Sequence, residues 1–190
     1  MVKMKLYNNF NVKKNHKNSI ILIGNFDGLH LGHQKLFRLA KKYKKKYSSK
    51  IGVLTFEPMP KMFFNPILKN FRLSNLNQKI ENLGKLNVDF VIIKKFNSIF
   101  SKTKSISFIK KILGKKLNPK FIFVSNNFKF GNKREGNVKQ LIKYEKLCKY
   151  KIIKPQPLSI KKQVISSSLL RKYLQNGKLN DVNKLLNRNW

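Results

Sequence analysis

Acidic residues are scarce in this chain of 190 residues, which has 7 aspartates and glutamates against 43 lysines and arginines. So few carboxylates leave no pair for general acid and base catalysis. The net charge of +36 would bind polyanions non-specifically. However, the positive charge comes mainly from lysines spread along the whole chain. Arginine, which proteins that recognise specific phosphates and bases tend to use, is rare. We attribute the charge to AT-rich codon bias and expect no specific nucleic-acid partner.

Cysteine and long apolar runs are also nearly absent. The single thiol, Cys148, excludes an internal disulfide and suits a reducing cytosol, so we expect a cytoplasmic protein in which this thiol is structural. The longest apolar runs, such as IILI and FVII, are too short to span a bilayer. The basic N-terminus lacks arginine and an apolar signal core, and we interpret it as part of the domain.

Strands and helices are expected to alternate along the chain. Strands are predicted at 19–24, 51–58, 89–96, 119–125 and 151–155. Helices are predicted at 31–47, 75–86 (with Ser74 as N-cap), 105–116, 137–150, 166–177 and 179–188. This alternation predicts an α/β fold with a parallel sheet covered on both faces. We expect one domain over 1–190, with a small helical segment at about 166–190, and a monomer.

Ligands of such sheets bind beyond the carboxyl ends of the strands. The loops to examine are therefore those that follow predicted strands. These are 24–33, 56–66, 94–104, 125–136 and 165–168.

The first of these loops, GNFDGLHLGH at 24–33, holds two of the three histidines. It has neither a G-x-G-x-x-G fingerprint nor a P-loop lysine. His30 and His33 stand at the predicted start of a helix, where free N–H groups and the helix dipole favour an anion. Gly32 permits a close approach of backbone or ligand. The loop predicts a phosphate site, since the pair lacks a convincing third ligand for a metal.

A second motif, ISSSLLR at 165–171, places Arg171 one helical turn after Ser168. Hydroxyls, backbone N–H groups and the guanidinium can then converge on a polyphosphate. Taken alone, the serines are ordinary N-caps. Taken with the first motif, they indicate a nucleotide held from two sides.

Two other loops leave their roles open. VSNNFKFG at 124–131 could grip a planar ring through an asparagine and an aromatic side chain, although rim packing explains its phenylalanines better. TFEPMP at 55–60 could line a pocket, or form a turn with one exposed glutamate.

GNFDGLHLGH, LTFEPMP, NNFKFG with a later glycine, and ISSSLLR follow one another in a distinctive order. With them the sequence resembles the FMN adenylyltransferase (FAD synthetase) module of the prokaryotic bifunctional riboflavin kinase/FMN adenylyltransferase family, from about residue 18 to the end. The resemblance implies a Rossmann-like nucleotidyltransferase fold and the transfer of AMP from ATP to FMN, giving FAD and pyrophosphate. The chain ends about where the family's kinase domain would begin, so we expect no riboflavin kinase activity.

The resemblance also implies the site residues. Its catalytic residues would be His30, His33, Ser168 and Arg171, and its other ATP-binding residues Gly24, Phe26, Gly32 and Ser167. Its FMN-binding residues would be Phe56, Pro58, Asn127 and Phe128. The histidines would stabilise charge at the α-phosphate, and the serines and arginine would hold the β- and γ-phosphates. Mg²⁺ would be held mostly by phosphates and water, without a dedicated protein ligand.

Three positions depart from the family's pattern. Met59 stands where the family usually has histidine, Ser168 where it usually has threonine, and Asn127 where many members have aspartate. Three alternatives to FAD synthesis remain. The chain could adenylylate another phosphate-bearing acceptor, act as a basic nucleic-acid-binding protein, or be a decayed enzyme.

Overall fold

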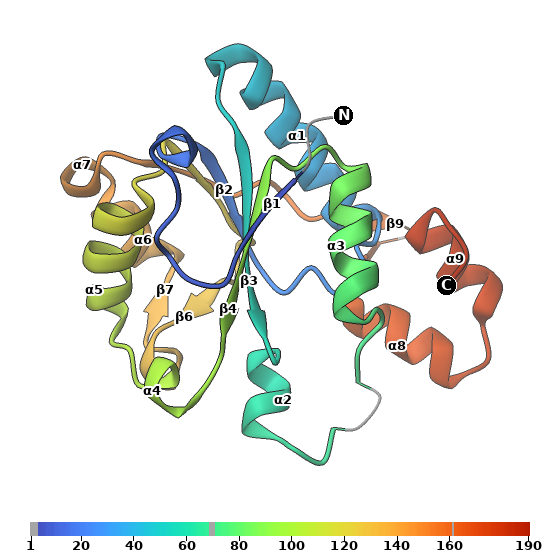
Figure 1. The fold of residues 1–190 in the computed structure, drawn as a ribbon. Coiled ribbons are helices and arrows are strands. Elements are labelled where there is room, and N and C mark those ends of the chain that lie inside the picture. Colours follow the sequence, from blue (N-terminus) through green and yellow to red (C-terminus); the bar gives the residue numbers. More distant parts are fainter. Residues whose placement is uncertain (1–3, 69–70, 161) are drawn as a thin grey trace.

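The computed structural model describes residues 4–68, 71–160 and 162–190. Its centre is a parallel sheet with the strand order β1-β4-β3-β2-β5-β8 (Figure 1). The strands are β1 (Lys5–Tyr7), β2 (Ile20–Ile23), β3 (Ile51–Glu57), β4 (Phe90–Lys95), β5 (Phe121–Phe123) and β8 (Lys151–Ile153). Two antiparallel pairs lie outside it, β6 (Lys129–Phe130) with β7 (Gly136–Asn137), and β9 (Ser159–Ile160) with β10 (Gln163–Val164).

Helices cover both faces of the sheet (Figure 1). On one face lie α1 (Leu31–Tyr47) and α3 (Leu76–Lys85). On the other lie α5 (Ser105–Ser107), the π-helix η2 (Phe108–Leu117), α6 (Val138–Lys143) and α7 (Glu145–Cys148). The remaining helices are η1 (Lys14–His16), α2 (Pro60–Phe64), α4 (Ser98–Ser101), η3 (Asn132–Arg134), α8 (Ser167–Gln175) and α9 (Leu179–Leu186). The expected α/β fold with a parallel sheet is therefore confirmed.

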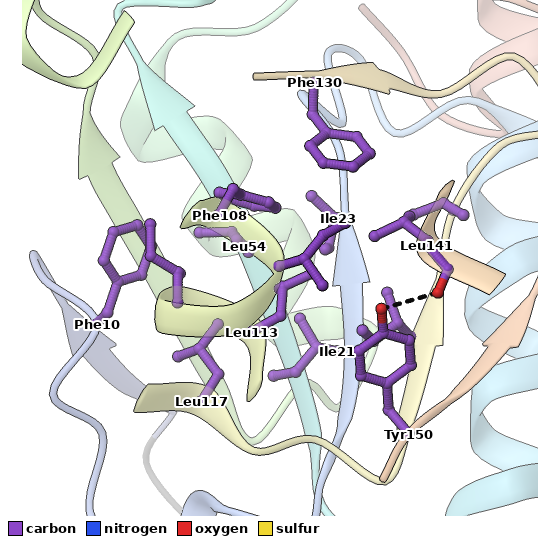
Figure 2. Close-up of a cluster of buried hydrophobic side chains, with 14 of the residues drawn as sticks. Phe10, Ile21, Ile23, Leu54, Phe108, Leu113, Leu117, Phe130, Leu141 and Tyr150 are labelled. Atoms are coloured by element: carbon purple, nitrogen blue, oxygen red, sulfur yellow. Dashed lines mark hydrogen bonds between the residues drawn. The ribbon is translucent and has the colours of Figure 1, made fainter. Parts of the chain in front are cut away.

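The inner strands β2, β3 and β5 are buried over most of their length because helices cover both faces of the sheet, as the continuous apolar runs predicted. In β2, Ile21 and Ile23 join the cluster under η2, whereas Ile20 and Leu22 pack under α1 (Figure 2 shows the first cluster). The hydroxyl of Tyr150 donates to the carbonyl of Leu141 at 2.9 Å, so this buried polar group is satisfied.

Cys148, only 9% exposed, lies in the cluster under η2, as expected for a structural thiol. Within the described part of the chain, no helix is both long and apolar enough to cross a membrane.

Several predicted boundaries were wrong. Asn75, not Ser74, caps α3, because Asn75 and Gln78 form a reciprocal capping box. The helix predicted at 105–116 winds largely as a π-helix, and the N–H of Asn118 bonds back to the carbonyl of Leu113.

Two other segments also differ from the prediction. The helix expected at 137–150 is interrupted at Tyr144, whose backbone leaves the helical region. The edge strand β1 was not predicted at all, because KLY is short and only partly buried.

Candidate functional site

A cleft of about 1150 Å³ lies at the carboxyl-terminal edge of the sheet. Each of the five loops singled out in the sequence contributes to its wall, which confirms the prediction made from strand ends. A further segment, 155–158, follows β8 and also lines the cleft. Sequence reasoning missed this segment, although its prolines mark it as a loop after a strand.

The turn between β2 and α1 lines this cleft and has an unusual backbone. Phe26, Gly28 and Leu29 have φ angles of 48°, 79° and 46°. Such values are unfavourable for residues with a side chain and occur where the surrounding structure holds them. At Gly28, a Cβ would lie 2.9 Å from a methyl carbon of Leu73. The turn is therefore strained and tightly packed against the chain around Leu73.

His30 and His33 lie together on the cleft wall at the start of α1. Their rings are stacked with centroids 3.8 Å apart. His30 is the N-cap of α1, and its Nδ1 accepts the backbone N–H of His33 at 3.4 Å. Because Nδ1 accepts, the proton of the neutral ring is on Nε2, which makes that atom a hydrogen-bond donor. Nδ1 of His33 is buried and has no hydrogen-bond partner among the described residues.

Both imidazoles are held in the neutral form. Burial, with a smaller effect from the charge of Arg171, lowers the pKa of His30 from 6.5 to about 4. Burial, with smaller effects from His30 and Lys79, lowers the pKa of His33 well below 6.5. At neutral pH the pair therefore offers hydrogen-bond donors rather than positive charges.

Gly32 allows α1 to begin this close to its neighbours. A Cβ at this position would lie 3.1 Å from the His30 ring and 3.2 Å from the carbonyl oxygen of Ile165. The glycine thus lets the turn that carries His30 and His33 lie against the segment that leads into α8. This is the close approach that was expected at Gly32.

The second motif forms the start of α8. Ser166 is the N-cap and accepts the N–H of Leu169, and the hydroxyl of Ser167 donates to the backbone carbonyl of Asp27 at 2.9 Å. Ser166 and Ser167 line the cleft, whereas Ser168 is exposed and is not among the described residues on its wall.

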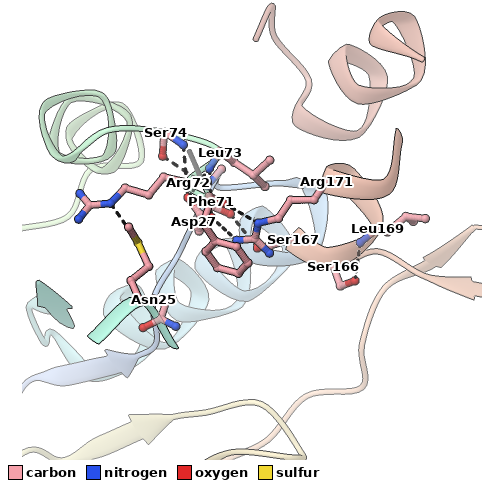
Figure 3. A network of polar contacts seen from close by, with 12 residues as sticks. Asn25, Asp27, Phe71, Arg72, Leu73, Ser74, Ser166, Ser167, Leu169 and Arg171 are labelled. Atoms are coloured by element: carbon pink, nitrogen blue, oxygen red, sulfur yellow. Dashed lines mark hydrogen bonds and ion pairs between the residues drawn. The ribbon is translucent and has the colours of Figure 1, made fainter. Parts of the chain in front are cut away.

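Arg171 is held beside the cleft rather than in it. Its guanidinium donates to the Asp27 carboxylate at 2.5 Å, and its Nε donates to the Phe71 carbonyl at 2.7 Å (Figure 3). The guanidinium also lies 3.7 Å from the centroid of the Phe71 ring, a cation–π contact. Arg171 is not among the described residues that line the cleft.

Aromatic side chains form another part of the cleft wall. Phe56 contacts Phe96 and Phe100 with ring centroids 6.0 and 5.6 Å apart, and Phe128 stacks on Phe130 at 5.5 Å. These five rings and Asn127 line the cleft, whereas Pro58 is not on its described wall. Gly24 and Phe26, assigned to ATP, do line it, although Phe26 is also packed into the core under α1.

The loop after β3 is more constrained than the sequence suggested. Glu57 is not an exposed turn residue: it forms an ion pair with Arg72, and its side chain is 23% exposed. Its Oε2 atom is buried with no hydrogen-bond partner in the described part of the chain. Met59 is 2% exposed and is not among the described residues that line the cleft, so this position contributes no polar group to it.

Sequence reasoning missed two buried charges. Asp27 is 2% exposed and accepts from three protein donors, although its motif was singled out. Lys79 is 3% exposed in α3. Burial lowers its pKa, whereas the carboxylates of Glu57 and Asp27 act in the opposite direction. Asp27 could have been found from its place in a glycine-rich turn of a chain with few acidic residues. Lys79 could not, because nothing in the sequence distinguishes it from the many other lysines.

Basic side chains outnumber acidic ones on the cleft wall. The cations are Lys35, Lys61, Lys129, Lys133 and Arg134, and the acid is Asp27. The cleft therefore attracts anions. In the part of the chain that the structure describes, no cluster of three or more His, Cys, Asp or Glu side chains could hold a metal ion.

Comparison with known proteins identifies relatives. A family model described as FAD synthetase matches residues 12–169. Bifunctional riboflavin kinase/FMN adenylyltransferases of Buchnera aphidicola subspecies Schizaphis graminum and Acyrthosiphon pisum are 40% and 37% identical over 94% of the chain. The Haemophilus influenzae protein of that name is 34% identical over 88% of the chain. The chain spans only 54 to 57% of the length of these curated relatives.

Solved structures support the fold. A crystal structure titled as a macrolide-efflux protein from Streptococcus pneumoniae superposes with a TM-score of 0.84 at 26% identity, covering 99% of this chain and 62% of that one. A pantoate-β-alanine ligase from Francisella tularensis gives a TM-score of 0.58 at 18% identity, covering 97% of this chain and 78% of the ligase. The second likeness concerns the fold alone.

Proposed function

The chain belongs to the FAD synthetase family, and on this basis we propose that it transfers AMP from ATP to FMN, releasing FAD and pyrophosphate. The observation that carries the proposal is the stacked, neutral His30–His33 pair on the wall of a cleft rich in aromatic and basic side chains. At about 1150 Å³ the cleft is at the upper limit of pockets for one small ligand, which suits two substrates side by side.

The chemical step needs alignment more than proton transfer. A phosphate oxygen of FMN attacks the α-phosphorus of ATP, and the bond from that phosphorus to the oxygen bridging to the β-phosphorus breaks. Near neutral pH the FMN phosphate is already largely ionised, because its second pKa is about 6. No general base is required, in agreement with a cleft wall that holds a single carboxylate among its described residues.

The histidines would act on the charge that develops at the α-phosphate. The Nε2–H of His30 is a preorganised donor because its Nδ1 is engaged at the helix N-cap. His33 lines the same wall, but its unpartnered Nδ1 is buried, so its ring would face the phosphate through its other nitrogen, Nε2. Donors fixed in a partly dehydrated site stabilise transition-state charge without reorganising.

The start of α8 would hold the β- and γ-phosphates. Ser166 and Ser167 line the cleft, and the start of a helix has N–H groups without an intrahelical partner that can bind an anion. Ser168 and Arg171 would have to move to contact the polyphosphate directly, since neither lines the described wall. In the present conformation the Arg171 charge acts through its contacts with Asp27 and Phe71.

The aromatic wall would receive FMN, with Phe56, Asn127 and Phe128 beside the isoalloxazine ring. Pro58 would act only by shaping the loop after β3. Gly24, Phe26 and Gly32 would border ATP. Mg²⁺ would arrive with ATP and be held mainly by phosphates and water. We also propose a monomeric, cytoplasmic protein with residues 1–190 in one domain, while the expected lack of riboflavin kinase activity stays a prediction.

The test is product analysis. Purified protein is incubated with ATP, Mg²⁺ and either FMN or riboflavin, and flavins are separated by chromatography. We expect FAD from FMN and no FMN from riboflavin, and we expect His33→Ala to lower kcat at least ~100-fold while FMN binding persists. No FAD under any condition would overturn the proposal. Phosphopantetheine and nicotinamide mononucleotide, offered as acceptors instead, test the alternative transferase.

A further inference from the structure

We propose that Asp27 is a positioning residue of the transfer reaction: its carboxylate joins the histidine turn, the chain at Leu73–Ser74 and Arg171 into one wall of the cleft. This inference rests on the proposed FMN adenylyltransferase function, because it assigns a role within that reaction. Nothing in the spacing of the sequence motifs had assigned Asp27 a role.

The contacts of Asp27 connect three segments that are far apart in the sequence. Its Oδ1 and Oδ2 accept the backbone N–H of Leu73 at 3.0 and 3.1 Å, and Oδ1 accepts that of Ser74 at 3.3 Å. Oδ2 also accepts the guanidinium of Arg171 at 2.5 Å, and the Asp27 carbonyl accepts the Ser167 hydroxyl. Figure 3 shows these groups meeting at one point. Both carboxylate oxygens are therefore occupied by protein donors, which leaves Asp27 a structural link rather than a substrate ligand.

The ion pair itself is well shielded from water. The side chains of Asp27 and Arg171 are 3% and 18% exposed. A buried carboxylate without its cation and donors would be strongly unfavourable, so each partner fixes the position of the other.

Asp27 lies inside the strained turn that carries the histidines. Its neighbours Phe26 and Gly28 both have positive φ angles, so the turn needs contacts that hold it. The N–H of Gly28 reaches the Ser74 hydroxyl at 3.4 Å, and His30 begins α1 two residues later. Release of the carboxylate would therefore let the histidine pair shift relative to the start of α8.

The same link extends to the rim of the cleft that α2 forms. Arg171 lies on the ring of Phe71, and the ammonium of Lys61 lies 4.7 Å from the centroid of that ring. Lys61 belongs to α2 and lines the cleft. Asp27 thus stabilises, through Arg171 and Phe71, the geometry of both the phosphate side and the rim formed by α2.

The first test is Asp27→Asn, which keeps the shape and one acceptor oxygen but removes the charge that pairs with Arg171. We expect kcat to fall about 100-fold with the KM for FMN unchanged, because displacement of a catalytic group by about 1 Å has that effect. The matched control is Asp89→Asn. Asp89 also pairs with a lysine (Lys44 at 2.6 Å) and accepts a backbone N–H (Ile51 at 2.7 Å), but at the opposite edge of the sheet. The control should keep the wild-type kcat. An unchanged kcat in Asp27→Asn, or an equal loss in the control, would overturn the inference.

A double-mutant cycle shows whether Asp27 acts through Arg171 or whether the two residues act independently. If Asp27 acts through Arg171, Asp27→Asn combined with Arg171→Lys should lower kcat no more than the worse single change. Multiplication of the two effects would contradict the inference.

Hydrogen exchange gives a readout that does not depend on activity. In Asp27→Asn, and in Arg171→Lys if the first variant fails to fold, amides of 24–33 should exchange faster than in wild type, while those of 51–57 are unchanged. Unaltered exchange at 24–33 would overturn the inference. FAD formation by the wild type tests the proposed function separately. If the wild type is inactive, the exchange measurement still shows whether Asp27 holds the turn.

Discussion

Replacement of His30 by asparagine should make the fold more resistant to acid. Asparagine can accept the same N-cap hydrogen bond from the N–H of His33, so the helix start is preserved. It does not titrate. The variant therefore removes the proton-binding of one buried ring and leaves the local hydrogen bonding largely intact.

The expected magnitude follows from the pKa of His30, which is about 4 in the folded protein and 6.5 as its ordinary value. Because the unfolded chain binds this proton more readily, the free energy of unfolding falls as pH drops from 6.5 toward 4 and is independent of His30 above that range. The full difference is about 3 kcal/mol, of which about 2.5 kcal/mol is lost by pH 4.5.

Urea denaturation at pH 7.5 and pH 4.5 measures the effect. Between these values the wild type should lose about 2.5 kcal/mol more than His30→Asn. His33 and the carboxylates are present in both proteins, so their contributions largely cancel in the comparison. Equal losses in the two proteins would show that His30 is not held neutral by burial, and the assignment of the pair as neutral donors would fail.

Four further substitutions test separate parts of the structure. Gly32→Ala should lower kcat about tenfold, because the new Cβ presses on the His30 ring. Gly84→Ala is the control, because a Cβ there meets no described atom within 4 Å. It should raise the free energy of unfolding by about 0.5–1 kcal/mol and leave steady-state kinetics unchanged. Phe128→Ala should raise the KM for FMN about tenfold and leave that for ATP unchanged, and a rise in both would remove Phe128 from the flavin wall. Tyr150→Phe should cost about 1 kcal/mol in urea denaturation without loss of activity, since it deletes a buried hydrogen bond between residues that do not line the described cleft wall.

The layered fold and the position of the cleft could be predicted from the sequence. Apolar strand runs alternate with helical periodicity, and parallel strands bring their carboxyl ends to one edge regardless of side-chain detail. The helix at 31–47 was predicted with its observed bounds, because Leu36, Leu39, Ala40 and Tyr43 recur at helical spacing. Proline marked the end of β3 equally clearly.

The side-chain partners could not be predicted. Arg171 was expected among the phosphates, yet it pairs with Asp27, 144 residues earlier in the chain. No periodicity encodes a pairing over that separation. Ser74 was expected to cap α3, whereas Asn75 does so through reciprocal hydrogen bonds with Gln78. Burial of Lys79 likewise arises from packing between elements rather than from its own segment.

The most direct test of the central claim is to follow labelled phosphorus from ATP. Purified protein is given FMN and Mg²⁺ with ATP labelled at either the α- or the γ-phosphorus, and flavin and pyrophosphate are separated. Transfer of AMP at the histidine pair predicts the α-label in FAD and the γ-label in pyrophosphate, with both signals greatly reduced in His33→Ala. Label from the γ-phosphorus in the flavin, or full transfer by His33→Ala, would contradict it.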